Sequence, residues 1–322
     1  MIALALTAAL FAQAAAAADP QSPPARAATT LSSQGQAAVL ATARGPGPPQ
    51  DLAGRRAFLD QAQRDGGARQ QKTYPVRIEA STMAGVPVRL ITPAGPPRQT
   101  RLVLLNLHGG GFNADSGSLT ENIPIAALTG VPVVAVLYRL APEHQADAAL
   151  ADAVAVYREL LKTHRPSEIG LYGTSAGAIL GPELIERLKT LGLPEPAVLG
   201  MFAGDADLTR TGGSEIAQKS DVAAQIQLYL GRIPAGSPAA SPLLGDLKGF
   251  PPTLCMTSTD DLFLSATANF CRGLDEAGVE SKLVVFDGLP HAFWAYIDAP
   301  ESDQAFRAMA RFLKGHLGKP AR

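Results

Sequence analysis

The chain has 322 residues, 46% of them hydrophobic, and a formal net charge of −1 at pH 7. A chain of this size buries a large core, either as one large α/β domain or as two small domains. The near-zero charge, without runs of like charge, excludes nucleic acid and an anionic membrane surface as the main partner. The two cysteines, Cys255 and Cys271, form no disulfide framework or metal motif, and we expect both to be small buried hydrophobic side chains.

The first 18 residues have the pattern of a signal peptide. A short apolar run over residues 2–12 is followed by alanines at 14–18 that offer an A-x-A cleavage site. The run is too short to span a bilayer, so we predict an exported protein, periplasmic or secreted, without a stable membrane anchor. The run is preceded by no Lys or Arg. An alanine-rich segment without a targeting role, in a protein that stays in the cytoplasm, is therefore the alternative.

The next two segments differ in composition. Residues 19–49 are rich in Ala, Gln, Ser and Pro and predict a disordered leader. Residues 51–71 predict a charged helix, which the pair Gly66-Gly67 interrupts or ends.

From residue 73 onward, strand-like and helical segments alternate in one domain over residues 73–322. Eight strands are predicted, at 74–80, 86–92, 102–107, 131–138, 169–172, 198–202, 252–257 and 282–286. The first two form a hairpin across residues 82–85, and helices are predicted at 147–163, 176–191, 265–277 and 303–317. This alternation predicts an α/β fold with a mainly parallel sheet covered on both faces, and places the chemistry at the carboxyl ends of the strands. Residues 205–242, with one helix at 221–230, have the composition of an insertion.

A G-x-S-x-G box, Gly173 to Gly177, joins the strand at 169–172 to the following helix. A serine between a strand and a helix lies on a sharp turn, where flanking glycines keep the two backbones apart. The box makes Ser175 a candidate nucleophile, although the box alone is weak evidence.

A second glycine cluster follows the strand at 102–107, in the run His108-Gly109-Gly110-Gly111-Phe112. Consecutive glycines expose backbone N–H groups to a ligand, because no Cβ blocks the approach. We expect an oxyanion hole from the N–H groups of this run together with that of Ala176. A flexible turn is the alternative, but a turn rarely needs three glycines directly after a buried strand.

The strand at 131–138 ends in Tyr138-Arg139-Leu140-Ala141-Pro142-Glu143-His144. The Arg, Glu and His of this run form a candidate catalytic cluster. We favour a structural role as a buried polar cluster that holds the loops under the site, because another histidine is better placed.

An acid and a histidine follow two late strands. Asp260 and Asp261 come after the strand at 252–257, and His291 comes after the strand at 282–286. The order Ser…Asp…His is the order of the α/β-hydrolase triad. Of the two acids Asp261 is preferred, because it leads directly into the next helix, and Asp260 is the alternative.

These motifs resemble those of the hormone-sensitive-lipase-like branch of the α/β-hydrolases, the bacterial family IV esterases. Three of them carry the resemblance: HGGG at 108–111, YRLAPEH at 138–144, and the box in its GTSAG form at 173–177. The resemblance implies the α/β-hydrolase fold with a helical cap formed by residues 50–72 and the insertion at 205–242. The acid motif departs from the family's D-P-L-x-D, since Leu262 follows Asp261, and Ala292 replaces the glycine after the histidine.

The resemblance also assigns roles to residues. It implies Ser175, Asp261 and His291 as the catalytic triad. The backbone N–H groups of Gly110, Gly111 and Ala176 are implied as the oxyanion hole. Tyr138, Arg139, Glu143 and His108 belong to its structural motifs. Phe112, Trp294 and Tyr296 lie where the aromatic walls of a pocket are expected, with core packing as the alternative for Phe112.

The expected substrate is a small-molecule ester with a short- to medium-chain acyl group, without metal or organic cofactor, in a monomer or a homodimer. Two other interpretations stay open. One is a lactone or amide hydrolase or a carbohydrate-ester deacetylase of the same fold. The other is a ligand-binding protein without activity on this fold, because fold alone does not confer function.

Overall fold

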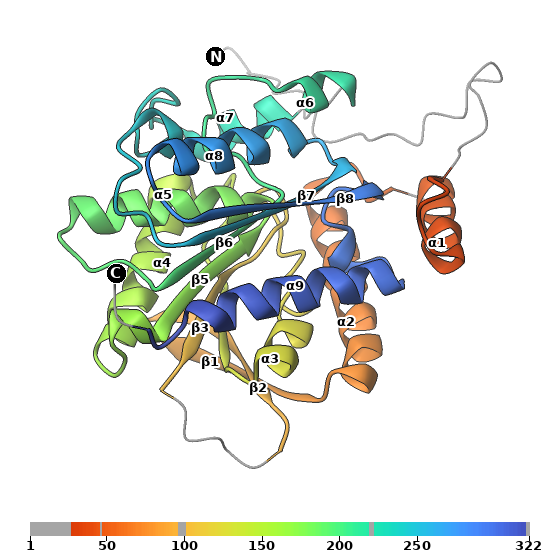
Figure 1. Ribbon diagram of the computed structural model, residues 1–322, viewed down its shortest axis with the longest axis horizontal. Coiled ribbons are helices and arrows are strands. Elements are labelled where there is room, and N and C mark those ends of the chain that lie inside the picture. Colours follow the sequence, from red (N-terminus) through yellow and green to blue (C-terminus); the bar gives the residue numbers. More distant parts are fainter. Residues whose placement is uncertain (1–26, 46, 96–100, 219–221, 320–322) are drawn as a thin grey trace, which may run out of the picture.

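The computed structural model describes residues 27–45, 47–95, 101–218 and 222–319. Within these residues one sheet of eight strands forms the centre of the molecule, in the order β1-β2-β4-β3-β5-β6-β7-β8 (Figure 1). The strands are β1 Val76–Met83, β2 Val86–Pro93, β3 Val103–Leu107, β4 Val133–Val136, β5 Ile169–Thr174, β6 Val198–Phe202, β7 Thr253–Asp260 and β8 Ser281–Pro290. β1 pairs antiparallel with β2, β2 pairs antiparallel with β4, and all other pairs are parallel. The predicted mainly parallel sheet and its first hairpin are confirmed.

Helices cover both faces of the sheet, which explains why its central strands are apolar without alternation. Every residue of β3, β4, β5 and β6 is buried. One core cluster joins the sheet to α4 (Ala146–Leu161), α5 (Ala176–Thr190) and α8 (Leu264–Glu276). The other joins its opposite face to α3 (Ile123–Thr129) and α9 (Pro300–His316). Figure 1 shows the sheet between these two layers.

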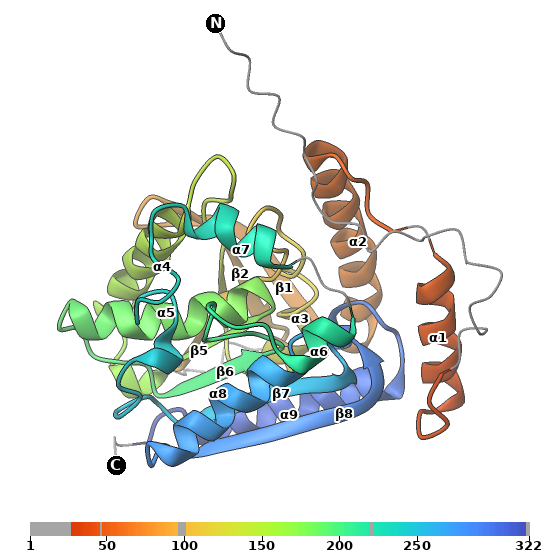
Figure 2. The same cartoon turned by 90° about the horizontal axis from the view of Figure 1, so that it is seen from above.

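Helix α2 spans Leu52–Thr73 and stands at one end of the molecule (Figure 2). It begins at its N-cap Asp51, whose Oδ1 accepts the N–H of Gly54 at 2.7 Å. The expected interruption at Gly66-Gly67 is wrong, because both glycines are buried inside the helix. A Cβ on Gly66 would lie 2.9 Å from Thr120 Cγ2, so the glycines let α2 approach the loop before α3 closely. This tertiary contact outweighs the low helix propensity of glycine.

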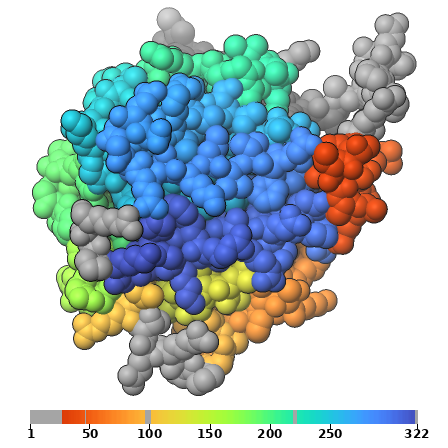
Figure 3. Space-filling view, viewed as in Figure 1, coloured from red at the N-terminus to blue at the C-terminus, as the bar shows by residue number. Residues whose placement is uncertain are grey.

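Part of the predicted disordered leader is a helix, α1 (Ser33–Arg44). It begins at the N-cap Ser32, whose hydroxyl accepts the N–H of Gly35. The backbone N–H of Ser32 donates to Glu301 Oε1 at 2.6 Å, and its hydroxyl donates to Oε2 at 3.0 Å. Figure 3 shows the surface of α1 against the C-terminal third of the chain. Composition alone does not indicate this docking, because it depends on a carboxylate distant in the sequence.

The predicted insertion contains two helices, α6 (Gly213–Ala217) and α7 (Val222–Leu230), of which only the second is predicted. Three short 3-10 helices complete the regular structure of the described residues, at Pro166–Glu168, Pro242–Leu244 and Phe293–Ala295. No helix among the described residues has both the length and the apolar character needed to cross a bilayer. The predicted signal peptide at 1–18 lies outside the described residues and stays a prediction.

Candidate active site

Ser175 lies on a sharp turn between β5 and α5. Its φ of 57° and ψ of −121° place a non-glycine residue in a strained region of the backbone. A Cβ on Gly173 would lie 2.3 Å from the carbonyl oxygen of Gly177, and a Cβ on Gly177 would lie 1.8 Å from that of Leu107. Only glycine therefore fits at either end of the box, and the turn lifts the serine out of the carboxyl edge of the sheet.

The structure brings His291 and Asp261 to this serine. Ser175 Oγ and His291 Nε2 are 2.8 Å apart, and His291 Nδ1 and Asp261 Oδ1 are also 2.8 Å apart. The Asp261 side chain is fully buried, whereas that of His291 is 25% exposed. Asp261 Oδ1 also accepts the N–H of Phe263 at 2.8 Å, which fixes the carboxylate. Between the two candidate acids the geometry selects Asp261, because Asp260 is exposed.

The loop predicted to form the oxyanion hole, which we call the oxyanion loop and define as His108–Phe112, follows β3 and faces the serine turn. Gly110 has a φ of 125° and Gly111 a φ of 63°. A Cβ on Gly110 would lie 2.0 Å from the carbonyl oxygen of Ala114, so only glycine fits there. Within the described residues, the N–H groups of Gly110, Gly111 and Ala176 donate to no protein acceptor. Ala176 is the first residue of α5, where an N–H has no partner within the helix and the helix dipole favours negative charge.

Comparison with known proteins gives the family. Residues 104–295 match the family of the α/β-hydrolase fold. The chain belongs to the α/β-hydrolase family. The acetyl-hydrolase of Streptomyces hygroscopicus is 31% identical over 240 residues, which are 70% of this chain and 79% of that protein.

Two solved structures place this α/β-hydrolase in the hormone-sensitive-lipase-like branch. The crystal structure of an esterase, E25, is 31% identical with a TM-score of 0.78, and the match covers 92% of this chain and 98% of that one. The crystal structure of an esterase from the bacterial hormone-sensitive lipase family is 29% identical with a TM-score of 0.74. This match covers 84% of this chain and 94% of that one. The chain is thus a carboxylesterase-like hydrolase, and the predicted fold and family are confirmed.

The YRLAPEH motif of this α/β-hydrolase is less buried than expected. Tyr138 is buried: its hydroxyl donates to the carbonyl oxygen of His108 at 2.7 Å, and the two rings stack at 4.2 Å. Arg139 and Glu143, in contrast, are exposed and pair with different helices. Arg139 binds Asp152 of α4. The expectation of one buried Arg–Glu–His cluster is wrong, because Arg139 and Glu143 have separate partners near the surface and His144 is exposed, which avoids the cost of burying charge.

Glu143 connects the motif to α2. Arg56 Nη2 lies 2.7 Å from Glu143 Oε2, and the Arg56 Nε donates to the carbonyl oxygen of Asn113 at 2.7 Å. The hydrogen bonds from Arg56, followed by that from the backbone of Glu143 itself, lower the pKa of this carboxyl group to about 2. The Arg56 side chain therefore ties α2 to the loop directly after the oxyanion loop.

The three aromatic side chains expected in a pocket wall have different positions. Trp294 is buried in the core against Phe202 and Phe293, and its Nε1 donates to Thr174 Oγ1 at 3.4 Å. It is no pocket wall, because the 3-10 helix after His291 turns it into the sheet. Phe112 is buried and stacks on Tyr229 of α7 at 3.5 Å between ring centroids. Tyr296 is 46% exposed, and its hydroxyl donates to the carbonyl oxygen of His291 at 2.8 Å.

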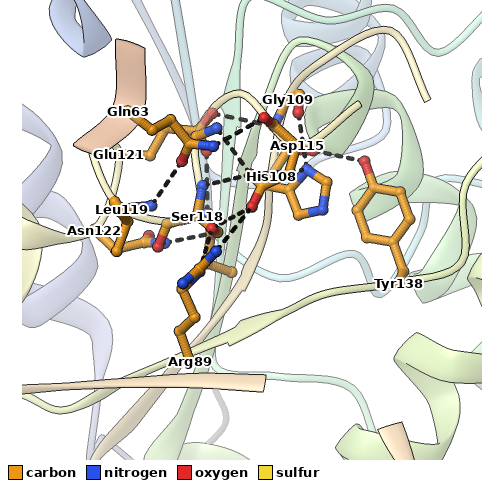
Figure 4. A network of polar contacts seen from close by, with 12 residues as sticks. Gln63, Arg89, His108, Gly109, Asp115, Ser118, Leu119, Glu121, Asn122 and Tyr138 are labelled. Carbon is orange, nitrogen blue, oxygen red and sulfur yellow. Dashed lines mark hydrogen bonds and ion pairs between the residues drawn. The ribbon is translucent and has the colours of Figure 1, made fainter. Parts of the chain in front are cut away.

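A polar network behind the oxyanion loop has no counterpart in the sequence analysis (Figure 4). Glu121 accepts the N–H of Gly109 at 3.1 Å, and burial raises the pKa of its carboxyl group to about 8. Asp115 lies 3.6 Å from His108 Nδ1 and accepts hydrogen bonds from Ser118. Burial opposes ionisation of Asp115, yet His108 and these hydrogen bonds lower the pKa of its carboxyl group. The sequence offers no signal for this network, since residues 113–122 have the composition of an ordinary polar loop.

Among the described residues, no three His, Cys, Asp or Glu side chains are grouped so that they could hold a metal ion. Cys255 and Cys271 are both buried, as expected, and form no disulfide.

Proposed function

We propose that this enzyme is a serine carboxylester hydrolase that works through an acyl-enzyme intermediate. The observation that carries the proposal is the continuous pair of hydrogen bonds from Ser175 Oγ through His291 to Asp261, each 2.8 Å long. A nucleophile bonded to a base, and that base bonded to a buried acid, is the arrangement that activates a serine.

The mechanism follows from the positions of these groups. His291 Nε2 takes the proton of Ser175 while the serine oxygen attacks the ester carbonyl. Asp261 stabilises the imidazolium that forms, because it is a buried carboxylate bonded to the other ring nitrogen. The negative charge on the carbonyl oxygen is held by the N–H groups of Gly110, Gly111 and Ala176, and each such donor is worth about 3–4 kcal/mol in the transition state.

The second half of the reaction uses the same groups. His291 gives the proton to the leaving alcohol and then takes a proton from a water molecule that attacks the acyl-enzyme. It returns this proton to Ser175 Oγ as the bond between the serine oxygen and the acyl group breaks and the carboxylic acid leaves. Its exposure of 25% supports this role, because a histidine on the solvent side of the serine can accept a proton from water. Tyr296 supports the orientation of the histidine loop by its hydrogen bond to the His291 carbonyl oxygen.

The substrate class that we propose is esters with short- to medium-chain acyl groups. Helix α7 lies against the oxyanion loop, with Tyr229 stacked on Phe112. Gln225 Oε1 lies 2.2 Å from the position that a Cβ of Gly111 would take, so this face of the loop is filled. The similarity to an acetyl-hydrolase supports a small acyl group.

A series of p-nitrophenyl esters from acetate to palmitate, with Ser175→Ala as the matched control, tests both parts of the proposal. We expect turnover of the acetate and butyrate esters, a steep fall for long chains, and a loss of at least about 10⁴-fold in kcat for Ser175→Ala. If Ser175→Ala keeps most of its rate, the serine mechanism is wrong. If wild type hydrolyses no ester but cleaves an anilide or a lactone, the substrate class is wrong. If it binds esters without turnover, the protein is a binding protein on this fold.

A further inference from the structure

Glu121 connects the two backbone segments between which the reaction takes place. It lies in the loop between β3 and α3 and is 2% exposed. Its Oε1 accepts the N–H of Gly109, in the oxyanion loop, at 3.1 Å. Its carboxyl group also hydrogen-bonds the side chain of Thr174, the residue directly before Ser175. The third partner is Asn106, whose Nδ2 donates to Oε2 at 3.3 Å. One side chain therefore contacts the oxyanion loop, the serine turn and the end of β3 together.

The chain around Glu121 is shaped to hold this carboxyl group. A Cβ on Gly117 would lie 1.7 Å from Glu121 Oε1, so only glycine fits opposite it. A Cβ on Gly109 would lie 3.2 Å from the same oxygen. Thr174 is held from its other side by Trp294, whose Nε1 donates to Thr174 Oγ1 at 3.4 Å. The carboxyl group thus fills a fitted space, in which it has little freedom to change its partners.

The charges around Glu121 favour its neutral form. No Lys, Arg or His among the described residues forms an ion pair with it. The titratable groups that face it are Asp115 from the same loop, Tyr138 from the end of β4 and Tyr172 from β5. The basic side chains of the network, Arg89 and His108, lie beside Asp115 instead, at 3.8 and 3.6 Å (Figure 4).

The pKa of the Glu121 carboxyl group agrees with this geometry. Burial raises it to about 8, against the hydrogen bonds from Gly109, Asn106 and Thr174, and the negative charge of Asp115 adds to the rise. At neutral pH most molecules therefore carry a proton on Glu121.

We propose that Glu121 is a positioning residue whose neutral carboxyl group fixes the oxyanion loop against the serine turn. In this form the carboxyl group hydrogen-bonds the side chain of Thr174, while Oε1 accepts the N–H of Gly109. Both segments are then held by one rigid group, so that the N–H groups of Gly110 and Gly111 face the position of the carbonyl oxygen before the reaction begins. This inference rests on the proposed function, since it concerns the oxyanion hole of that reaction.

Ionisation of Glu121 acts against the reaction, because its charge opposes the negative charge that develops on the substrate oxygen beside the same loop. The pH profile therefore distinguishes positioning by the neutral acid from a merely structural role. Such a role would change stability and leave the shape of the profile unchanged.

The test compares E121Q, E121A and the control Glu168→Gln by their kcat and KM from about pH 6 to about pH 10. Glutamine keeps a neutral donor and acceptor in the same shape, and alanine removes both. Glu168 is also a buried glutamate, but it lies before the opposite end of β5 and binds Arg165. Protein with an unchanged circular dichroism spectrum is used, and p-nitrophenyl butyrate is the substrate.

We expect the kcat of wild type and of Glu168→Gln to fall above about pH 8, with the same apparent pKa. E121Q should keep kcat at neutral pH within about threefold and lose this fall. E121A should lose about 10²-fold in kcat with little change in KM, because the contact acts on the transition state. The inference is overturned if E121Q keeps the fall of wild type, or if folded E121A keeps its kcat.

The outcome is separate from the test of the proposed function. If Ser175→Ala is inactive while E121Q and wild type have the same profile, the serine mechanism stands and the role of Glu121 is wrong. If Ser175→Ala is active, the proposed function itself fails. Should E121A not fold, the profile of E121Q decides alone.

Discussion

Two buried carboxyl groups, those of Asp261 and Glu121, lie near Ser175 in different surroundings. Asp261, after β7, has a histidine as its partner and an N–H donor from the following residues. Glu121, before α3, has only neutral hydrogen-bonding partners and a second acid nearby. The first carboxyl group bonds a histidine side chain, and the surroundings of the second favour a bound proton. At one active site, the partner thus decides whether a buried carboxyl group holds a side chain or a backbone in place.

Substitution of Asp261, the partner of His291, should give the largest effect on kcat. Asp261→Asn is expected to reduce kcat by about 10³–10⁴-fold, because the amide cannot stabilise the imidazolium and favours the wrong tautomer of His291. Asp260→Asn is the matched control: it changes the neighbouring, exposed acid and should alter kcat less than about twofold. Equal losses in the two variants would show that the geometry has selected the wrong acid.

Substitution in the oxyanion loop should give the second-largest effect on kcat. Gly110→Ala places a Cβ 2.0 Å from the carbonyl oxygen of Ala114, at a φ of 125°, so the loop must move. We expect a loss of about 10²–10³-fold in kcat, as for the removal of one oxyanion donor.

Gly95→Ala controls for backbone strain, because Gly95 has a φ of 109° and no atom of the described residues lies within 4 Å of the position that its Cβ would take. It should cost about 1 kcal/mol in the free energy of unfolding and leave kcat unchanged. If Gly110→Ala behaves in the same way, the loop does not hold the oxyanion.

The smallest effect should come from the ion pair of Arg56 and Glu143, which lies outside the two carboxyl sites and affects stability. Both side chains are partly exposed, at 33% and 51%, so a double-mutant cycle should give a coupling energy below about 1 kcal/mol that decreases with salt. Since the pKa of Glu143 is lowered to about 2, its contribution is present above about pH 5 and is lost as the pH falls toward 2. A coupling that grew on acidification would contradict this sign.

The positions of His291 and of the glycines in the two motifs could be predicted, because the sequence patterns that indicate them are local. Nearby backbone atoms leave no room for a Cβ at Gly173, at Gly177 or at Gly110 after β3. His291 directly follows a strand. The eight strands were predictable for the same reason, since buried parallel strands are continuous apolar runs.

The role of Glu121 could not be predicted, because its three partners lie on segments that meet only in the fold. The same holds for Gly66 and Gly67. Local propensity marks them as a helix end, but close packing of Gly66 against Thr120 and of Gly67 against Ile123 keeps them inside α2. Trp294 was misplaced because a residue three positions after His291 can point to the site or to the core, and only the 3-10 helix decides between them.

The most direct test of the central claim, that Ser175 is a nucleophile activated by His291, is labelling with a p-nitrophenyl alkylphosphonate followed by mass spectrometry. We expect one phosphonyl group per chain, on the peptide that contains Ser175, with release of one p-nitrophenol. Labelling should be at least about 10³-fold slower in His291→Ala. Label on another residue, or labelling of Ser175 at the same rate without His291, would show that Ser175 is not a nucleophile activated by His291.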